Sequence, residues 1–185
     1  MTMPFFSIDP NETPETLEQK FLKLFEERGR SAEAWRAHAH ALREAANTMW
    51  EGPLDHHQVA MMLDGLAIEA LAKAVQIAQD PTLVSAGRWT LKSHDLESLV
   101  AEAGLVVDAN QRSLLIRLTG FVTWAGRYPI PLKSKAMTPT MNASTKELSM
   151  PAGTWIADGD REAASKIFGR LERVLSNQRG AQPSS

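Results

Sequence analysis

The sequence predicts an all-α protein, an antiparallel helical bundle of about five to six helices with a long irregular segment before the last one. Apolar residues recur at three- and four-residue spacings through most of the chain, which is the period of an α-helix. Alternating, strand-like patterns are scarce. Residues that start and stop helices divide the chain between the periodic segments.

The composition fits one ordinary domain. The 185 residues are 43% hydrophobic and 23% charged, close to the globular average, which argues against a disordered or fibrous chain. No apolar run approaches the roughly 20 residues that cross a bilayer, and the first residues lack the pattern of a signal peptide. The chain has no cysteine, so disulfides, thiolate metal sites and cysteine nucleophiles are excluded. We expect a cytoplasmic protein that does not associate with membranes.

The domain organisation follows from these patterns. We expect a helical domain with an N-terminal helix over residues 1–132, an irregular loop over 133–159, a C-terminal helix over 160–179 that packs on the same domain, and a disordered tail over 180–185.

Caps predict the first two helices. Thr13 and Pro14 suit the N-cap and first position of a helix that ends at Gly29. Ser31 caps a second helix, which stops at Gly52. The third helix, over 54–79, is apolar around most of its circumference and therefore belongs in the middle of the bundle.

An irregular stretch over 80–92 leads to a short fourth helix with Ser93 as the expected N-cap and Gly104 near its end. Asp108 and Gln111 resemble a capping box at the start of a fifth helix that ends at Gly126. The segment after it is rich in Pro, Ser, Thr and Met and predicts a short strand or a mobile loop. An amphipathic helix over about 161–178 follows.

Charge is distributed unevenly along the chain. Lys and Arg against Asp and Glu number 7 and 13 in residues 1–80, 7 and 4 in 81–135, and 6 and 5 in 136–185, which gives −6, +3 and +1 and the total of −2. The locally basic middle is consistent with an anion-facing patch or with ordinary solvated surface.

Three stretches of the chain resemble the HEPN family, the higher-eukaryote and prokaryote nucleotide-binding domain. They are GLAIEALAKAVQIAQ at 65–79, SHDLESLVAEAGL at 93–105 and LLIRLTGFVTWAGRYPIP at 114–131. In that family a helix with a Glu-x-x-x-Lys step precedes a His-Asp-Leu helix start and a further long helix. The resemblance implies an all-α bundle, commonly a homodimer, that handles RNA or nucleotide, and its members include toxin and abortive-infection ribonucleases of phage defence. An antitoxin or a nucleotidyltransferase would be a partner typical of that class.

Active ribonucleases of the family carry an Arg that is followed directly by a polar residue. A His comes later, with four to six positions between it and the Arg. Arg88 and His94 have this spacing, although Trp89 stands where the family has a polar residue. As a metal-independent endoribonuclease, the protein would use His94 as general base and Arg88 or Arg127 to stabilise the phosphate charge.

His94 and Asp95 are expected at the first and second positions of the fourth helix. Asp95 there complements the positive end of the helix. His94 points away from the leucine stripe of its own helix and is either a loop anchor or a binding or catalytic group.

Glu69 and Lys73 are four residues apart, with Lys73 inside the apolar sector of its helix. A charge in that position requires a partner, so we expect a buried pair.

Seven-residue spacing aligns Asn110, Arg117 and Trp124 on the fifth helix. Arg117 and Trp124 would stack on a nucleobase or pack on each other. Arg127 and Tyr128 follow in a proline-stiffened exit that is either a ligand contact or a rigid strut.

The histidines give no metal signature. His38 and His40 are two apart, and His56 and His57 are adjacent, so neither pair has the four-residue spacing that lets two imidazoles share one zinc on a helix. We expect no metal and no cofactor.

The leading hypothesis is a HEPN-like protein of unproven activity, leaning away from an enzyme, that binds RNA, nucleotide or a protein partner. The alternatives are an RNA-cleaving toxin and a purely structural dimerisation module. The expected binding surface consists of residues from the basic middle of the chain: Arg88, Lys92, His94, Asp95, Arg117, Trp124, Arg127 and Tyr128.

Overall fold

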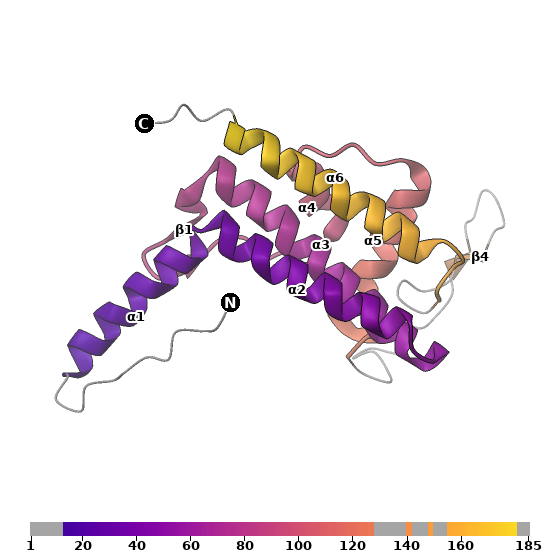
Figure 1. Ribbon diagram of the computed structural model, residues 1–185, viewed down its shortest axis with the longest axis horizontal. Helices are drawn as coiled ribbons and strands as arrows, with labels where there is room; N and C mark the ends of the chain where they lie inside the picture. Colours follow the sequence, from indigo (N-terminus) through magenta and orange to yellow (C-terminus); the bar gives the residue numbers. More distant parts are fainter. Residues whose placement is uncertain (1–12, 128–139, 142–147, 150–154, 181–185) are drawn as a thin grey trace.

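The computed structural model describes residues 13–127, 140–141, 148–149 and 155–180. These residues form a helical bundle with two small antiparallel strand pairs (Figure 1). The predicted all-α fold is therefore confirmed. The elements in chain order are α1 (Pro14–Gly29), α2 (Ala32–Trp50), η1 (Leu54–His56), α3 (His57–Gln79), η2 (Pro81–Leu83), β1 (Val84–Ser85), β2 (Arg88–Trp89), α4 (Leu96–Glu102), α5 (Ala109–Gly120), η3 (Phe121–Ala125), β3 (Thr140–Met141), β4 (Leu148–Ser149) and α6 (Asp160–Gly180).

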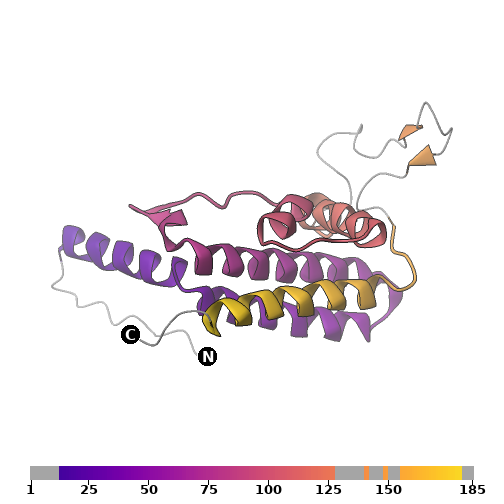
Figure 2. The ribbon, with the colours of Figure 1, turned by 90° about the horizontal axis from the view of Figure 1, so that it is seen from above.

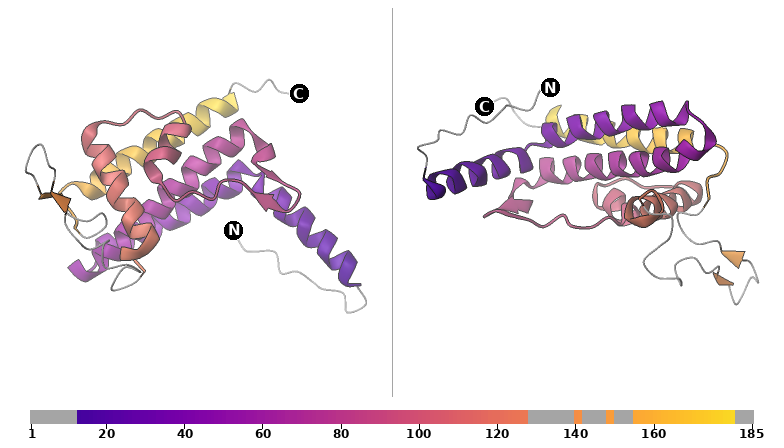
Figure 3. Two further views of the ribbon diagram at one scale, coloured as in Figure 1. Left: turned by 180° about the vertical axis from the view of Figure 1, so that it is seen from behind. Right: turned by 90° about the horizontal axis from the view of Figure 1, so that it is seen from below.

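Helix α3 is the middle of three layers (Figure 2). In Figure 2, α2 and α6 lie on one side of α3, and α4, α5 and the 84–95 segment lie on the other. Helices α4 and α5 cross α3 at a steep angle rather than running along it (Figure 3). Helix α3 is thereby covered on all sides, which is why 15 of its residues are buried. This is the central position that its apolar circumference predicts.

The predicted caps are confirmed in the first two helices and in α5. The Thr13 and Ser31 side chains accept hydrogen bonds from the backbone N–H groups of Thr16 and Ala34. Asp108 and Gln111 form a complete capping box. Helix α5 continues into the π-helical turn η3, and Gly126 ends it. Sequence patterning located these ends because a cap is a local interaction.

Two predicted details are wrong. The N-cap of α4 is Asp95 and not Ser93, because the Asp95 carboxylate accepts from the N–H and the hydroxyl of Ser98. The stretch predicted to be irregular contains a hairpin in which Ser85 pairs with Arg88. Its two-residue turn has positive φ at both Ala86 and Gly87, as a type I′ turn requires, and Ala86 gives no sequence signal for it.

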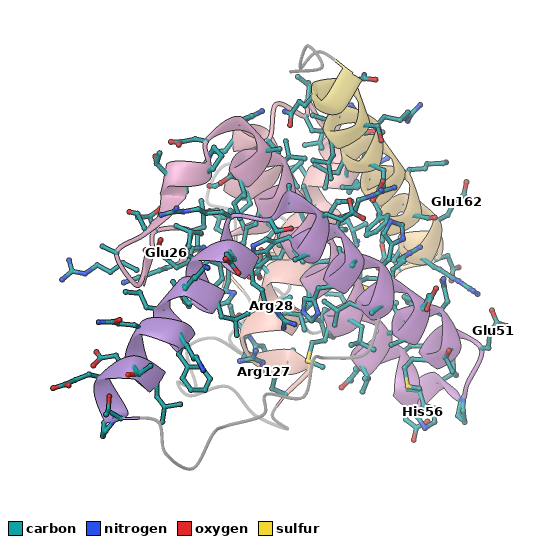
Figure 4. All side chains as sticks on the ribbon, turned by 60° about the vertical axis from the view of Figure 1, so that its left-hand side comes forward. Glu26, Arg28, Glu51, His56, Arg127 and Glu162 are labelled. Carbon is teal, nitrogen blue, oxygen red and sulfur yellow. The ribbon has the colours of Figure 1, made fainter. Side chains whose placement is uncertain are left out.

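The predicted C-terminal helix lies on the bundle. Helix α6 packs against α3 and α5, and Arg161 at its start pairs with Glu51 just beyond α2, at 2.6 Å between Nη2 and Oε1. Figure 4 shows Glu51 at this end of the molecule and Glu162 on the outer side of α6. Within the irregular loop predicted for 133–159, β3 pairs with β4. The rest of that loop up to residue 154 and the tail beyond residue 180 lie outside the described residues.

No helix among the described residues is long and apolar enough to span a bilayer.

A buried polar cluster joins α2 to α3. Asp64 on α3 is fully buried. Its carboxylate pairs with the Arg43 guanidinium and accepts a hydrogen bond from the Trp50 indole at 2.9 Å. Burial raises the pKa of the Asp64 carboxyl above its ordinary value of 3.8, because desolvation outweighs the opposing effects of Arg43 and Trp50.

This raised pKa makes a prediction about stability and pH. The folded protein holds the Asp64 proton more tightly than the unfolded chain, so the stability that this proton provides is present below the unfolded pKa and is lost as pH rises through the folded one. Asp64→Asn removes the titration. We expect the free energy of unfolding of Asp64→Asn, relative to the wild type, to increase in urea denaturation as the pH rises above the ordinary Asp value of 3.8.

Asp80→Asn is the matched control. The side-chain hydroxyl and backbone N–H of Thr82 lower the pKa of the exposed Asp80 carboxyl, so its stabilisation is present at high pH and is lost as pH falls through the folded pKa. The relative stability of Asp80→Asn should therefore decrease with rising pH. Two curves of the same sign would contradict the assignment of Asp64.

Candidate functional site

His94 lies in the connection between β2 and α4, in which the Lys92 N–H donates to the Thr90 carbonyl at 2.8 Å. The backbone on its C-terminal side is fixed by the Asp95 cap and by Thr119 of α5, whose hydroxyl accepts a hydrogen bond from the N–H of Leu96 at 3.1 Å. The His94 side chain is 50% exposed. The imidazole thus stands at the surface on an anchored stretch of backbone.

The residue that faces His94 across the bundle is Glu69 of α3. The His94 Nδ1 lies 2.9 Å from Glu69 Oε2 and 3.1 Å from Oε1. A carboxylate oxygen can only accept, so Nδ1 is the donor. In the neutral imidazole the lone pair is then on Nε2, which has no hydrogen-bond partner among the described residues.

Lys73 completes the cluster. Its Nζ lies 2.6 Å from Glu69 Oε1, and the lysine is 1% exposed while Glu69 is 7% exposed. The structure therefore contains the buried pair expected from the sequence, and adds His94 as a second partner of the carboxylate. The two buried charges cancel, so the cluster supplies no net charge while the imidazole is neutral.

Trp89 of β2 covers the lysine. The Lys73 Nζ lies 4.7 Å from the centroid of the Trp89 ring, within the range of a cation–π interaction. The other neighbour of this ring is Trp35 of α2, at a centroid distance of 4.9 Å. The sequence did not predict a role for Trp89 here. Its contact joins a hairpin residue to a helix distant in the chain, and such a contact has no characteristic residue spacing.

Four of the described cations in the basic middle of the chain are exposed, and one of them, Arg112, is paired with Glu97. Arg88, Lys92 and Arg127 are exposed, and within the described part of the chain their side chains make no ion pair or hydrogen bond. Arg88, Lys92 and His94 belong to one connection in which the intervening Trp89 and Leu91 are partly buried. Arg88 and Lys92 are exposed on this connection, and the half-exposed imidazole of His94 contacts Glu69 through Nδ1. Arg127, labelled in Figure 4, lies on a different segment, just after η3.

Arg117 is not on this surface. It is buried and forms a two-pronged pair with Asp160 at the start of α6, and its guanidinium lies 4.0 Å from the Trp155 ring centroid. Its observed aromatic partner is therefore Trp155, rather than Trp124 or a nucleobase. Asn110 is exposed and Trp124 half-buried. Asp95 is occupied as the cap of α4, and Tyr128 lies outside the described residues.

An apolar hollow of about 1040 Å³ adjoins the same tryptophans. It lies between α1, the start of α2 and the hairpin, and its lining includes Leu22, Phe25, Trp35, Gly87 and Trp89. Trp89 thus lies between the hollow and Lys73.

Among the described residues, no group of three or more His, Asp or Glu side chains is placed to hold a metal ion. His40 instead contacts Glu172 of α6, at 2.7 Å between Nε2 and Oε1.

The fold and site together define a class: an all-α bundle with a buried Glu–Lys pair that orients one exposed imidazole. Comparison with known proteins adds no family, because no protein-family model, curated protein or solved structure matches this chain.

The buried pair makes a prediction about stability. Glu69→Gln leaves the Lys73 ammonium without a countercharge in a dry environment, so we expect a loss of about 3 kcal/mol in the free energy of unfolding. The double variant Glu69→Gln, Lys73→Met removes the stranded charge and should recover most of that loss. Chemical denaturation of both variants tests this. Equal losses in the two would show that the charge pair is not what stabilises this position.

Proposed function

We propose that this chain is a HEPN-like protein that binds RNA through the edge formed by Arg88, Lys92 and His94. The observation that carries the proposal is a pair of exposed cations, Arg88 and Lys92, that have no partner among the described residues and lie on the same connection as an anchored imidazole. Elsewhere in the described chain, exposed cations such as Arg112, Arg161 and Lys166 are paired with carboxylates. Cations without such partners are the groups that neutralise phosphates.

The order of these side chains along the backbone supports a linear ligand. Arg88, Lys92 and His94 follow one another on a single connection, so a strand that runs along this connection meets them in turn. The resemblance of the three motifs to the HEPN family agrees with RNA or nucleotide as the ligand class.

Salt dependence tests the proposal. A short fluorescent oligouridylate should bind the wild type with an affinity that falls steeply with salt. Arg88→Ala with Lys92→Ala should weaken binding and reduce the slope of log affinity against log salt by about 1.4, which is about 0.7 for each single-strand phosphate that is no longer neutralised. Fluorescence anisotropy measures both quantities.

Lys166→Ala is the matched control. Lys166 is an exposed cation of α6, which lies across α3 from the 84–95 segment (Figure 2). This variant removes the same kind of charge and should leave affinity and slope unchanged. If both sets of variants weakened binding equally, RNA affinity would depend only on the net charge of the protein. That result would contradict a binding site at the proposed edge.

A second candidate, metal-independent RNA cleavage, is favoured by one observation. An imidazole whose Nδ1 donates to a buried carboxylate presents Nε2 as a base. If the protein is a ribonuclease, wild-type protein in chelator cuts total RNA and His94→Ala does so at least about 100-fold more slowly. Intact RNA after prolonged incubation with the wild type removes this candidate and leaves binding untouched.

A dimerisation module with no RNA ligand is the remaining alternative. This alternative is supported if the wild type shows no salt-dependent affinity for RNA and sediments as a dimer.

A further inference from the structure

We infer that His94 is a specificity residue for the sugar of the bound strand: its Nε2 accepts a hydrogen bond from a ribose 2′-hydroxyl and so favours RNA over DNA. This inference rests on the proposed RNA binding and assigns its preference to one atom.

Glu69 sets the direction of its hydrogen bond with His94. Glu69 already accepts from Lys73 at 2.6 Å and from His94 Nδ1 at 2.9 Å. The oxygens of a carboxylate can only accept hydrogen bonds. The proton of the neutral imidazole therefore stays on Nδ1, and the outward nitrogen is an acceptor.

The ligand must supply a donor to this acceptor. Phosphate oxygens at neutral pH accept hydrogen bonds and cannot donate one to an Nε2 lone pair. Arg88 and Lys92 are pure donors, and they suit phosphates. His94 needs a donor on the ligand, and the donor next to each phosphate of an RNA backbone is the 2′-hydroxyl, which DNA lacks.

The position of His94 suits this contact. His94 lies two residues beyond Lys92 on the same connection, and both side chains are exposed. A strand whose phosphate contacts Lys92 therefore brings its sugar–phosphate backbone, rather than its bases, past the imidazole. Phosphate affinity and sugar preference are then separate properties of neighbouring side chains.

The experiment compares three strands with identical bases: oligouridylate, its 2′-deoxy form and its 2′-O-methyl form. The methylated strand keeps the RNA-like sugar and loses only the donor, so it separates hydroxyl donation from sugar shape. At about pH 8, where an ordinary imidazole is neutral, the wild type should bind the RNA about fivefold more tightly than either other strand, as expected for one hydrogen bond.

Two variants test whether His94 causes the preference for RNA. His94→Ala should bind all three strands equally, with an affinity close to that of the wild type for the deoxy strand. Lys92→Ala is the control, because removing a cation that binds phosphate should weaken all three strands by the same factor and preserve the RNA preference.

The outcomes separate this inference from the proposed function. If all three strands bind the wild type equally, or if His94→Ala keeps the preference, the role of His94 is overturned while RNA binding stands. If the methylated strand binds as tightly as RNA, sugar shape and not the hydroxyl is recognised, which also overturns it. If no strand binds, the proposed function itself fails.

Discussion

The structure depends on the buried ion pair between Glu69 and Lys73 in α3, the central helix of the bundle. Helix α3 is apolar around most of its surface, and Lys73 and Glu69 are among the few charges within it. A buried ammonium is tolerated only with a countercharge and hydrogen bonds. The cluster meets this requirement with the Glu69 carboxylate on one side and the Trp89 ring on the other. The hairpin that carries Trp89 and the connection that carries His94 are thus fixed by contacts with the same two α3 side chains.

That arrangement gives the surface its chemistry. Because Lys73 already neutralises Glu69, the carboxylate orients the imidazole without making the site acidic. The exposed cations on the same connection, Arg88 and Lys92, then face outward beside an imidazole whose free nitrogen is an acceptor. Donors for phosphate and an acceptor for a hydroxyl occur on one edge, and this combination distinguishes the edge from a plain basic patch.

The sequence predicts what is local and misses what is tertiary. The caps at Thr13, Ser31 and Asp108 and the central position of α3 follow from short-range rules. The buried Glu69–Lys73 pair follows from helical periodicity, because a charge inside an apolar sector needs a partner. The partner of Arg117 did not follow, since Asp160 is 43 residues away across an irregular stretch. The α4 cap was misplaced because Ser93 and Asp95 both suit an N-cap, and the choice depends on how Leu96 contacts Thr119.

We infer that the buried Glu69 carboxylate accepts from Nδ1 of His94 and leaves Nε2 as an acceptor at the surface. Long-range proton–nitrogen NMR of the imidazole measures this directly. At about pH 8, where an ordinary imidazole is neutral, we expect a proton on Nδ1 and the chemical shift of an unprotonated nitrogen at Nε2. In the double variant Glu69→Gln, Lys73→Met, the imidazole proton should no longer be held on Nδ1. A neutral ring with its proton on Nε2 in the wild type would contradict this hydrogen-bond direction.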